Sequence, residues 1–346
     1  MKLKNAIIQL NSVFEQLKMK AEVIDCKEET PFLIFDIALL PGGTFRKLER
    51  NSTEIALALK SLSNPLIYPL TTQGVVRMEI MISEQENVMF SDICKNENHL
   101  SLPLDLGKMR DGSVLSIDLS KMPHLLIGGT TGSGKSILLH NIINSLMLNS
   151  KCEFALIDTK RVEFSYYDNI SRLFGPIARD VDGAILLFQE LIEEMEERFK
   201  ILEKNRCRDI SEYPDMKYIV IIIDELADLM MIAKKDIQKL ICRLAQKSRA
   251  CGIHLVAATQ RPSTDVVTGI IKANFPSRIS CQVSSSTDSR TILDSNGAEK
   301  LAGKGDAIIN TPNIKFKRFK GAFISQEEIK ENVLNHQSFW REIWAS

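Results

Sequence analysis

The clearest chemical pattern in the chain lies in HLLIGGTTGSGKSILLHNIINS, residues 124–145. Gly129, Gly134, Lys135 and Ser136 have the spacing GxxxxGK[ST], after an apolar run typical of a strand and before an amphipathic helix pattern. A glycine-rich turn would match this spacing by accident in roughly one chain in a hundred of this length. The flanking strand and helix patterns therefore predict a phosphate-binding loop.

Each residue type in this loop suits an anion. Glycines tolerate positive φ and carry no Cβ, so the loop can direct several backbone N–H groups at a phosphate. A triphosphate would then lie at a helix N-terminus, where Lys135 reaches the β- and γ-phosphates and the Ser136 hydroxyl coordinates Mg²⁺. The expected nucleotide-binding residues are Gly129, Thr130, Thr131, Gly132, Ser133, Gly134, Lys135 and Ser136.

Two further strand patterns end in polar residues. YIVIII is a fully apolar run that leads into Asp224 and Glu225, as expected for a buried central strand whose acidic end lies beside the phosphates. In phosphate-loop enzymes the first carboxylate holds Mg²⁺, and an adjacent glutamate can polarise the attacking water. The strand in GIHLVAATQRP ends in Thr259 and Gln260, which predicts an uncharged sensor of the γ-phosphate.

Two other segments lie near these strands. FALIDTK reads as a buried strand and places Asp158 and Lys160 at the carboxyl edge of the sheet, where open α/β sheets bind ligands. The amphipathic helix that ends in LAQKSRA offers Arg249 at the edge of the sheet. This arginine could stabilise transition-state charge across a subunit boundary or act as a cation favoured by the helix dipole, and the residues leave both open.

Composition limits the class of protein. With 346 residues, 44% of them apolar, the chain is long enough for about two domains. Its 44 basic residues balance its 44 acidic residues, so any contact with nucleic acid needs a local basic patch. The seven cysteines are scattered without a CxxC pair, which is typical of reduced thiols in a cytoplasmic protein. We expect no membrane-spanning segment and no secretory signal.

The patterns along the chain predict three parts. Residues 1–104 combine an amphipathic helix with alternating strands and a helix, as in a small α+β domain, and residues 107–112 read as a hinge. Residues 105–325 alternate strands and helices, which predicts an α/β core with a mainly parallel sheet. Residues 326–346 read as a helical tail that docks on the core in preference to an external partner, with an apolar stripe formed by Ile329, Val333, Trp340 and Ile343 or Trp344.

Four stretches of the chain resemble one family. HLLIGGTTGSGKS, IDELADLMM, LAQKSRACGIHLVAATQRPSTDVVTGIIKANFPSRI and QVSSSTDSRTILDSNGAEKLAGKGDA are together similar to the motor of the FtsK/SpoIIIE double-stranded DNA translocases. The segment from about Thr30 to Leu104 is similar to the small domain that precedes this motor. The resemblance covers roughly residues 25–325.

The resemblance implies a RecA-like P-loop NTPase core that assembles as a homo-hexameric ring and drives duplex DNA through a central pore with ATP and Mg²⁺. Such motors serve chromosome segregation, cell division or mobile-element transfer. The motif match implies that nucleotide and metal are bound by Lys135, Ser136 and Asp224. It further implies that Glu225 is the general base, that Gln260 is the sensor, and that Arg249 is an arginine finger supplied to the neighbouring subunit. The residues implied to contact DNA are Arg261, Lys272 and Arg290.

The segment from Arg261 to Arg290 holds four cations and two carboxylates, with hydroxyls at residues 284–287. Such groups contact phosphate oxygens without reading sequence. Many family members carry a lysine where this chain has Ser286, and from the sequence we expect neither the winged-helix domain nor the membrane helices that longer members often carry. These departures leave open a motor of the same superfamily for conjugative transfer of single-stranded DNA or for protein secretion. A separate alternative is a nucleotide-gated clamp that does not hydrolyse ATP, which the presence of Glu225 and Gln260 disfavours.

Overall fold

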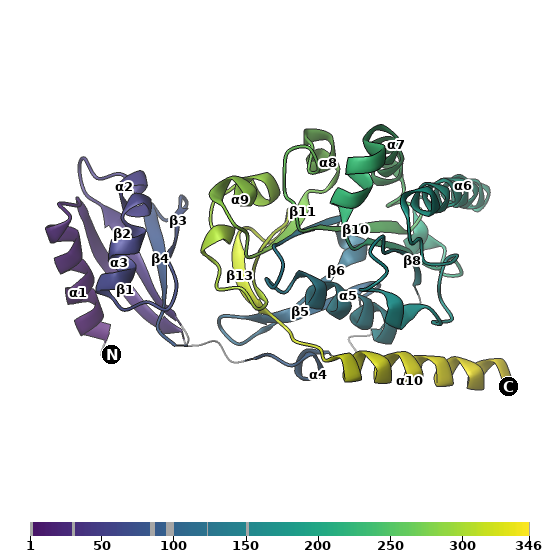
Figure 1. Ribbon diagram of the computed structural model, residues 1–346, viewed down its shortest axis with the longest axis horizontal. Helices are drawn as coiled ribbons and strands as arrows, with labels where there is room; N and C mark the ends of the chain where they lie inside the picture. The colour runs from purple at the N-terminus through teal and green to yellow at the C-terminus, as the bar shows by residue number, and fades with distance from the viewer. Residues whose placement is uncertain are drawn as a thin grey trace. The chain divides into compact units, whose positions relative to one another are not determined.

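The computed structural model describes residues 3–29, 32–83, 87–94, 100–122, 124–149 and 152–345, without the side chains of residues 149 and 337–345 (Figure 1). It divides the chain into two compact units, one of residues 1–87 and 297–302 and one of residues 88–296 and 303–346. The expected domain limit at residue 104 lies inside strand β5 (Pro103–Met109), which pairs with strands of the second unit. The first unit therefore ends earlier in the chain than the sequence pattern indicates.

The first unit is the expected small α+β fold. Its antiparallel sheet has the order β1-β2-β4-β3. Helix α1 buries Ala6, Leu10, Val13 and Phe14, which recur at helical spacing along one face. Its elements are α1 (Leu3–Gln16), β1 (Ala21–Glu29), β2 (Phe32–Leu39), α2 (Phe45–Arg50), α3 (Ser52–Ala58), β3 (Leu66–Leu70) and β4 (Val75–Met81).

The second unit is built on a nine-stranded sheet with the order β6-β5-β13-β12-β11-β7-β10-β9-β8. Strands β11, β7, β10, β9 and β8 run parallel to one another, and the remaining four pair antiparallel. This arrangement confirms the predicted mainly parallel α/β core. Its elements are α4 (Phe90–Ile93), β5, β6 (Val114–Asp118), β7 (Leu125–Gly128), α5 (Lys135–Asn149), β8 (Glu153–Ile157), α6 (Val181–Lys204), β9 (Ile219–Ile223), α7 (Leu226–Lys247), β10 (Ile253–Thr259), α8 (Gly269–Asn274), β11 (Ser277–Cys281), α9 (Ser286–Leu293), β12 (Asp306–Asn310), β13 (Lys317–Gly321) and α10 (Gln326–Ala345).

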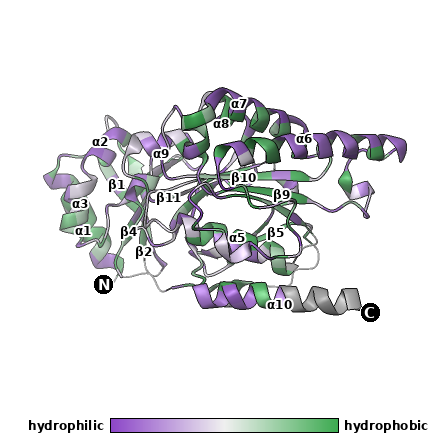
Figure 2. Ribbon diagram, turned by 45° about the vertical axis from the view of Figure 1, so that its right-hand side comes forward, coloured by the Kyte–Doolittle hydropathy of each residue, from purple (hydrophilic) through white to green (hydrophobic). Residues whose placement is uncertain are grey.

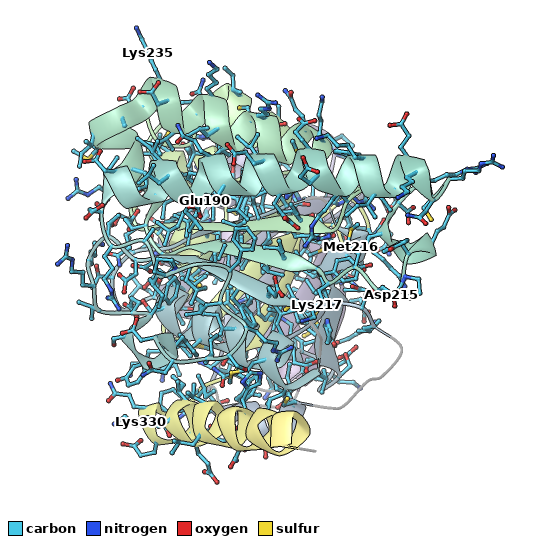
Figure 3. All side chains as sticks on the ribbon, turned by 90° about the vertical axis from the view of Figure 1, so that its right-hand side faces the viewer. Glu190, Asp215, Met216, Lys217, Lys235 and Lys330 are labelled. Atoms are coloured by element: carbon cyan, nitrogen blue, oxygen red, sulfur yellow. The ribbon has the colours of Figure 1, made fainter. Side chains whose placement is uncertain are left out.

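Helices cover both faces of the parallel strands. Helices α6 and α7 lie on one face and α5 on the other, while apolar residues concentrate along β9 and β10 between them (Figure 2). Successive residues of β9 alternate between the two core clusters: Val220 and Ile222 pack on the α5 side, and Ile219, Ile221 and Ile223 on the α6 and α7 side. Glu190 of α6 and Lys235 of α7 are exposed on the outer surface (Figure 3). Burial on both faces explains why these strands are continuous apolar runs.

The segment expected to be a hinge is a β-hairpin. Residues 109–113 form the turn between β5 and β6, closed by the Met109 N–H, which donates to the Ser113 carbonyl at 2.8 Å. A Cβ at Gly107 would lie 2.0 Å from the Lys320 carbonyl oxygen of β13. Glycine is therefore needed here for close approach between strands, and not for bending between domains.

Helix α10 packs on its own unit, as expected of the tail. Ile329 and Val333 are buried in the core cluster on the α5 side. The Asn332 side-chain amide donates to the Asn144 side-chain oxygen of α5 at 3.0 Å. The other residues of the predicted stripe, Trp340, Ile343 and Trp344, lie outside the described side chains. Within the described part of the chain, no helix combines the length and hydropathy needed to cross a bilayer.

Two histidines are buried at the start of the parallel strands. The His124 ring accepts a hydrogen bond from the Leu255 N–H at 2.9 Å. Burial lowers the pKa of His124 to about 4 and that of His254 to about 3. The positive charge of Arg249 lowers both further, while Asp118 opposes the shift at His254. Both imidazoles are therefore neutral in the folded protein at pH 7.

These lowered pKa values predict acid sensitivity. A histidine in the unfolded chain titrates near pH 6.5, so as the pH falls the unfolded state binds protons before the folded state does. The contribution of these neutral histidines to the free energy of unfolding is therefore complete above pH 6.5 and is lost as the pH falls toward 4. His254→Phe removes one of these groups while keeping an apolar ring beside Tyr218. Between pH 6.5 and 5 we expect wild type to lose about 2 kcal/mol more unfolding free energy than the variant.

Urea unfolding of both proteins at several pH values measures this difference. The two should be similar in stability at pH 8, where the histidine is neutral in both folded and unfolded states. Parallel stability curves for the two proteins between pH 6.5 and 5 would contradict the assignment.

Candidate active site

The glycine-rich loop joins β7 to α5 at the centre of the parallel sheet. Strand β7 pairs with β10 on one side and β11 on the other, so the loop emerges among three carboxyl strand ends. Gly132 and Gly134 have φ of +78° and +105°, the region that favours glycine. At Gly129 a glycine is needed for a different reason, because there is no room for a side chain. A Cβ there would lie 2.6 Å from the Ser133 Oγ and 2.8 Å from the Cys281 Cβ.

Neighbouring strands hold the loop in place. The Gly129 N–H donates to the Thr259 carbonyl at 3.2 Å, and the Thr130 N–H donates to the Gln282 carbonyl at 2.9 Å. The Gly305 N–H donates to the Ser133 carbonyl at 2.8 Å. The first N–H groups of α5 lack helical acceptors by the geometry of any α-helix, and α5 begins at Lys135. The loop is therefore held in one shape at a helix N-terminus, a position that favours the binding of anions.

Lys135 and Asp224 form a buried ion pair. The Lys135 Nζ lies 3.0 Å from the Asp224 Oδ1 and 2.8 Å from the Asp224 carbonyl oxygen. Both side chains are 2% exposed. Burial raises the pKa of Asp224, while the ammonium of Lys135 opposes that rise. The pair joins the start of α5 to the end of β9, as the linked sequence motifs predict.

Glu225 is fixed at the beginning of α7. Its carboxylate accepts hydrogen bonds from the Thr259 hydroxyl at 2.8 Å, the Gln260 N–H at 3.0 Å and the Ala227 N–H at 3.3 Å. The Lys160 Nζ lies 3.6 Å from the Glu225 Oε2. These contacts join the ends of β8, β9 and β10 around one carboxylate.

Gln260 lies beside the glycine-rich loop. Its side-chain oxygen accepts a hydrogen bond from the Thr131 hydroxyl at 3.0 Å. Lys135, Asp224, Glu225 and Gln260 therefore lie at the same edge of the sheet. An anion on the loop would face a cation, two carboxylates and a neutral amide, which is a set suited to phosphoryl transfer. The Ser136 hydroxyl and the Asp224 carboxylate are oxygen ligands of the type that could hold Mg²⁺.

Arg249 lies at the other end of the parallel strands. It follows α7 and precedes β10, and its guanidinium donates to the Lys121 carbonyl at 3.2 Å, just before β7. The structure therefore separates Arg249 from the glycine-rich loop of the same chain.

The three cations expected to contact DNA differ in their surroundings. Arg261 and Arg290 are exposed, with hydrogen bonds to the Met231 Sδ at 3.4 Å and the Asn296 Oδ1 at 3.2 Å. Lys272 instead forms an ion pair with Asp294, which also pairs with Arg278. The positive charge of Lys272 is therefore partly neutralised within the fold.

Glu163 is a further residue of this site, which the sequence patterns did not predict. The Ser136 hydroxyl donates to the Glu163 Oε1 at 2.7 Å, and the His140 Nε2 lies 3.5 Å from the Glu163 Oε2. The hydrogen bonds that the Glu163 carboxylate accepts from His140 and Ser136 lower its pKa, while partial burial opposes this shift. Glu163 follows Asp158 and Lys160 in the same loop, so the argument that placed those two residues at the carboxyl edge could have been extended to it.

Comparisons with known proteins give a consistent result. A model of the FtsK/SpoIIIE family matches residues 94–217 and 211–264. The chain is 37% identical to the DNA translocase FtsK of Treponema pallidum over 97% of this chain and 44% of that protein. It is 39% identical to the DNA translocase FtsK of Corynebacterium glutamicum over 94% of this chain and 38% of that protein. The chain thus spans less than half the length of these relatives.

Solved structures share the fold. The monomer of the pCW3 conjugation coupling protein TcpA superposes with a TM-score of 0.70 at 23% identity, over 96% of this chain and 99% of that chain. The cytoplasmic domain of the Thermomonospora curvata type VII secretion ATPase EccC has a TM-score of 0.63 at 21% identity, over 73% of this chain and 34% of that chain. Both have the same α/β fold as the second unit of this chain.

The two glycines with positive φ provide a matched test of the loop. Alanine is strained at either position, but a Cβ at Gly132 meets nothing within 4 Å, whereas a Cβ at Gly134 would lie 2.5 Å from the Gly305 backbone nitrogen. We expect Gly134→Ala to weaken binding of a nucleoside triphosphate at least tenfold more than Gly132→Ala does. Isothermal titration calorimetry would measure both, and equal losses would show that strain, and not the contact with Gly305, determines the loop shape.

Proposed function

Because the chain belongs to the FtsK/SpoIIIE family, we propose that it hydrolyses ATP to move double-stranded DNA through a ring of identical subunits. The main support for this proposal is sequence identity of 37% or more, across nearly the whole chain, with relatives named DNA translocase FtsK. The meeting of Lys135, Asp224, Glu225 and Gln260 at one sheet edge supports the hydrolytic part of the proposal.

In this mechanism the glycine-rich loop and Lys135 bind the phosphates of ATP. Ser136 and Asp224 would hold Mg²⁺, which would neutralise charge at the phosphate oxygens. Glu225 accepts the proton of the attacking water, and its three hydrogen-bond donors hold the carboxylate in one orientation. Gln260 contacts Thr131 of the loop and precedes Arg261, so it is suited to link the γ-phosphate to the segment proposed to contact DNA.

The position of Arg249 supports the proposal of a ring. Its distance from the loop of its own subunit, at the opposite end of the strands, is consistent with an arginine finger that acts on a neighbouring subunit. We propose a homo-hexamer, with one nucleotide at each subunit boundary. A cytoplasmic location suits an enzyme that consumes ATP and carries seven cysteines without a disulfide.

The first test is the ATPase rate with and without long linear duplex DNA. We expect strong stimulation by duplex, loss of nucleotide binding in Lys135→Ala, and a fall in kcat of about a hundredfold or more in Glu225→Gln, because a positioned general base contributes that much. Lys200→Ala, on the exposed surface of α6, is the control. A rate unaffected by any DNA would overturn the translocase proposal, and greater stimulation by single strands would favour the alternative motor for single-stranded DNA.

The DNA contacts are tested by the salt dependence of duplex binding. Each lost phosphate contact should lower the slope of log affinity against log salt by about 1. We expect this change in Arg261→Ala and Arg290→Ala, because both guanidinium groups are exposed. Lys272→Ala should change the slope less and lower the melting temperature more, since Lys272 pairs with Asp294. Equal slopes for wild type and both arginine variants would exclude these loops from the DNA contact.

A further inference from the structure

The hydroxyl of Ser136 already has a specific acceptor in this structure. It donates to the Glu163 Oε1 at 2.7 Å, while the Asp224 carboxylate is engaged by Lys135. We propose that Glu163 is a positioning residue, which orients the Ser136 hydroxyl so that its oxygen faces the metal ion of a bound metal–nucleotide complex. This inference rests on the proposed function in one respect, namely that the loop binds a nucleotide together with a divalent cation.

The chemistry of a serine hydroxyl gives the reason. The group has one proton and two lone pairs. When the Ser136 O–H donates its hydrogen bond to a carboxylate, both lone pairs of the Ser136 oxygen remain available to a cation. Hydrogen-bonded partners of metal ligands commonly orient the ligand and raise its basicity in this way. Glu163 therefore acts on the metal through Ser136, and needs no contact with the phosphates.

The loop that carries Glu163 is held at both ends. The Asp158 Oδ2 accepts a hydrogen bond from the Phe164 N–H at 3.0 Å, and the Asp158 carbonyl accepts one from the Arg161 N–H at 3.2 Å. Arg161 has a φ of +60°, an uncommon conformation for a residue with a side chain. Phe164 and Tyr167 are fully buried just after Glu163. These anchors fix the direction in which the Glu163 side chain leaves the backbone.

A chain of hydrogen bonds supports the carboxylate from behind. The His140 Nε2 lies 3.5 Å from the Glu163 Oε2, and the His140 Nδ1 lies 2.9 Å from the Tyr167 hydroxyl. The Asn144 side-chain amide donates to the same hydroxyl at 3.0 Å. His140 and Asn144 follow Ser136 at intervals of four residues, so all three lie on one face of α5. The far end of this chain is Asn332 of α10, bonded to Asn144.

The test separates metal binding from nucleotide binding. Affinity for ADP is measured by calorimetry with Mg²⁺ and again with EDTA, in wild type, Glu163→Gln and Glu163→Ala of the full chain. We expect Glu163→Ala to bind metal-free ADP within about twofold of wild type and to lose about tenfold of the enhancement given by Mg²⁺. Glu163→Gln, which keeps the shape and one oxygen acceptor, should retain part of that enhancement.

A second readout uses Mn²⁺ alone as the probe. Its affinity for the ADP complex, followed by electron paramagnetic resonance, should fall by the same factor as the Mg²⁺ enhancement. Asp168→Asn is the matched control, because this loop carboxylate pairs with Arg179 and does not contact Ser136. Melting temperatures of all variants identify any that fail to fold, in which case Glu163→Gln carries the test.

The outcomes are distinct. Equal loss of metal-free and metal-dependent affinity would show a purely structural role for Glu163 and overturn the inference. An unchanged Mg²⁺ enhancement in Glu163→Ala would overturn it as well, as would a wild type whose ADP affinity does not depend on Mg²⁺. By contrast, failure of the proposed motor function would appear as an ATPase unaffected by DNA, with the metal-dependent binding of ADP intact.

Discussion

The buried pair of Lys135 and Asp224 is the interaction on which the site depends. Two opposite charges, each 2% exposed, are stable in the interior only while they face each other at 3.0 Å. Removal of one partner from such a pair typically costs about 3–5 kcal/mol, since the other charge stays buried without compensation. The pair therefore fixes the start of α5 against the end of β9, although 89 residues separate the two along the chain. A bound phosphate would offer the ammonium a second anionic partner, which makes the pair a natural point for nucleotide binding to act.

The order of the strands makes this pair possible. Strand β10 lies between β7 and β9, so the carboxyl ends of all three strands are adjacent. The polar residues that follow these strands form hydrogen bonds with one another. Glu225 after β9 accepts from Gln260 after β10, and Gln260 accepts from Thr131 after β7. Each of these residues is ordinary in isolation. Their chemistry arises because parallel strands direct their carboxyl ends to one edge.

Residues with a strong local pattern could be predicted from the sequence, and residues placed by tertiary packing could not. The glycine-rich loop, the buried strand before Asp224 and the docking of α10 follow from spacing and hydropathy. Glu163 could not be predicted in this way, because its residue type does not distinguish it from other loop carboxylates. Only the folded turn at Arg161 places it beside Ser136. Gly107 was assigned to a hinge because glycine signals a turn and a close approach equally well, and only the pairing of β5 with β13 decides between them.

The two sides of the glycine-rich loop have different supports. On the side of Ser136, the contacts run through Glu163, His140 and Tyr167 to α5 and α10, away from the cationic segment. On the side of Thr131, they run through Gln260 directly into Arg261 and the loop that follows β10. A change at the γ-phosphate would therefore reach the segment proposed to hold DNA through one strand end, while the side of Ser136 stays anchored in the core. In a motor, this asymmetry would allow a change at the γ-phosphate to shift the DNA-contacting segment while the nucleotide stays bound.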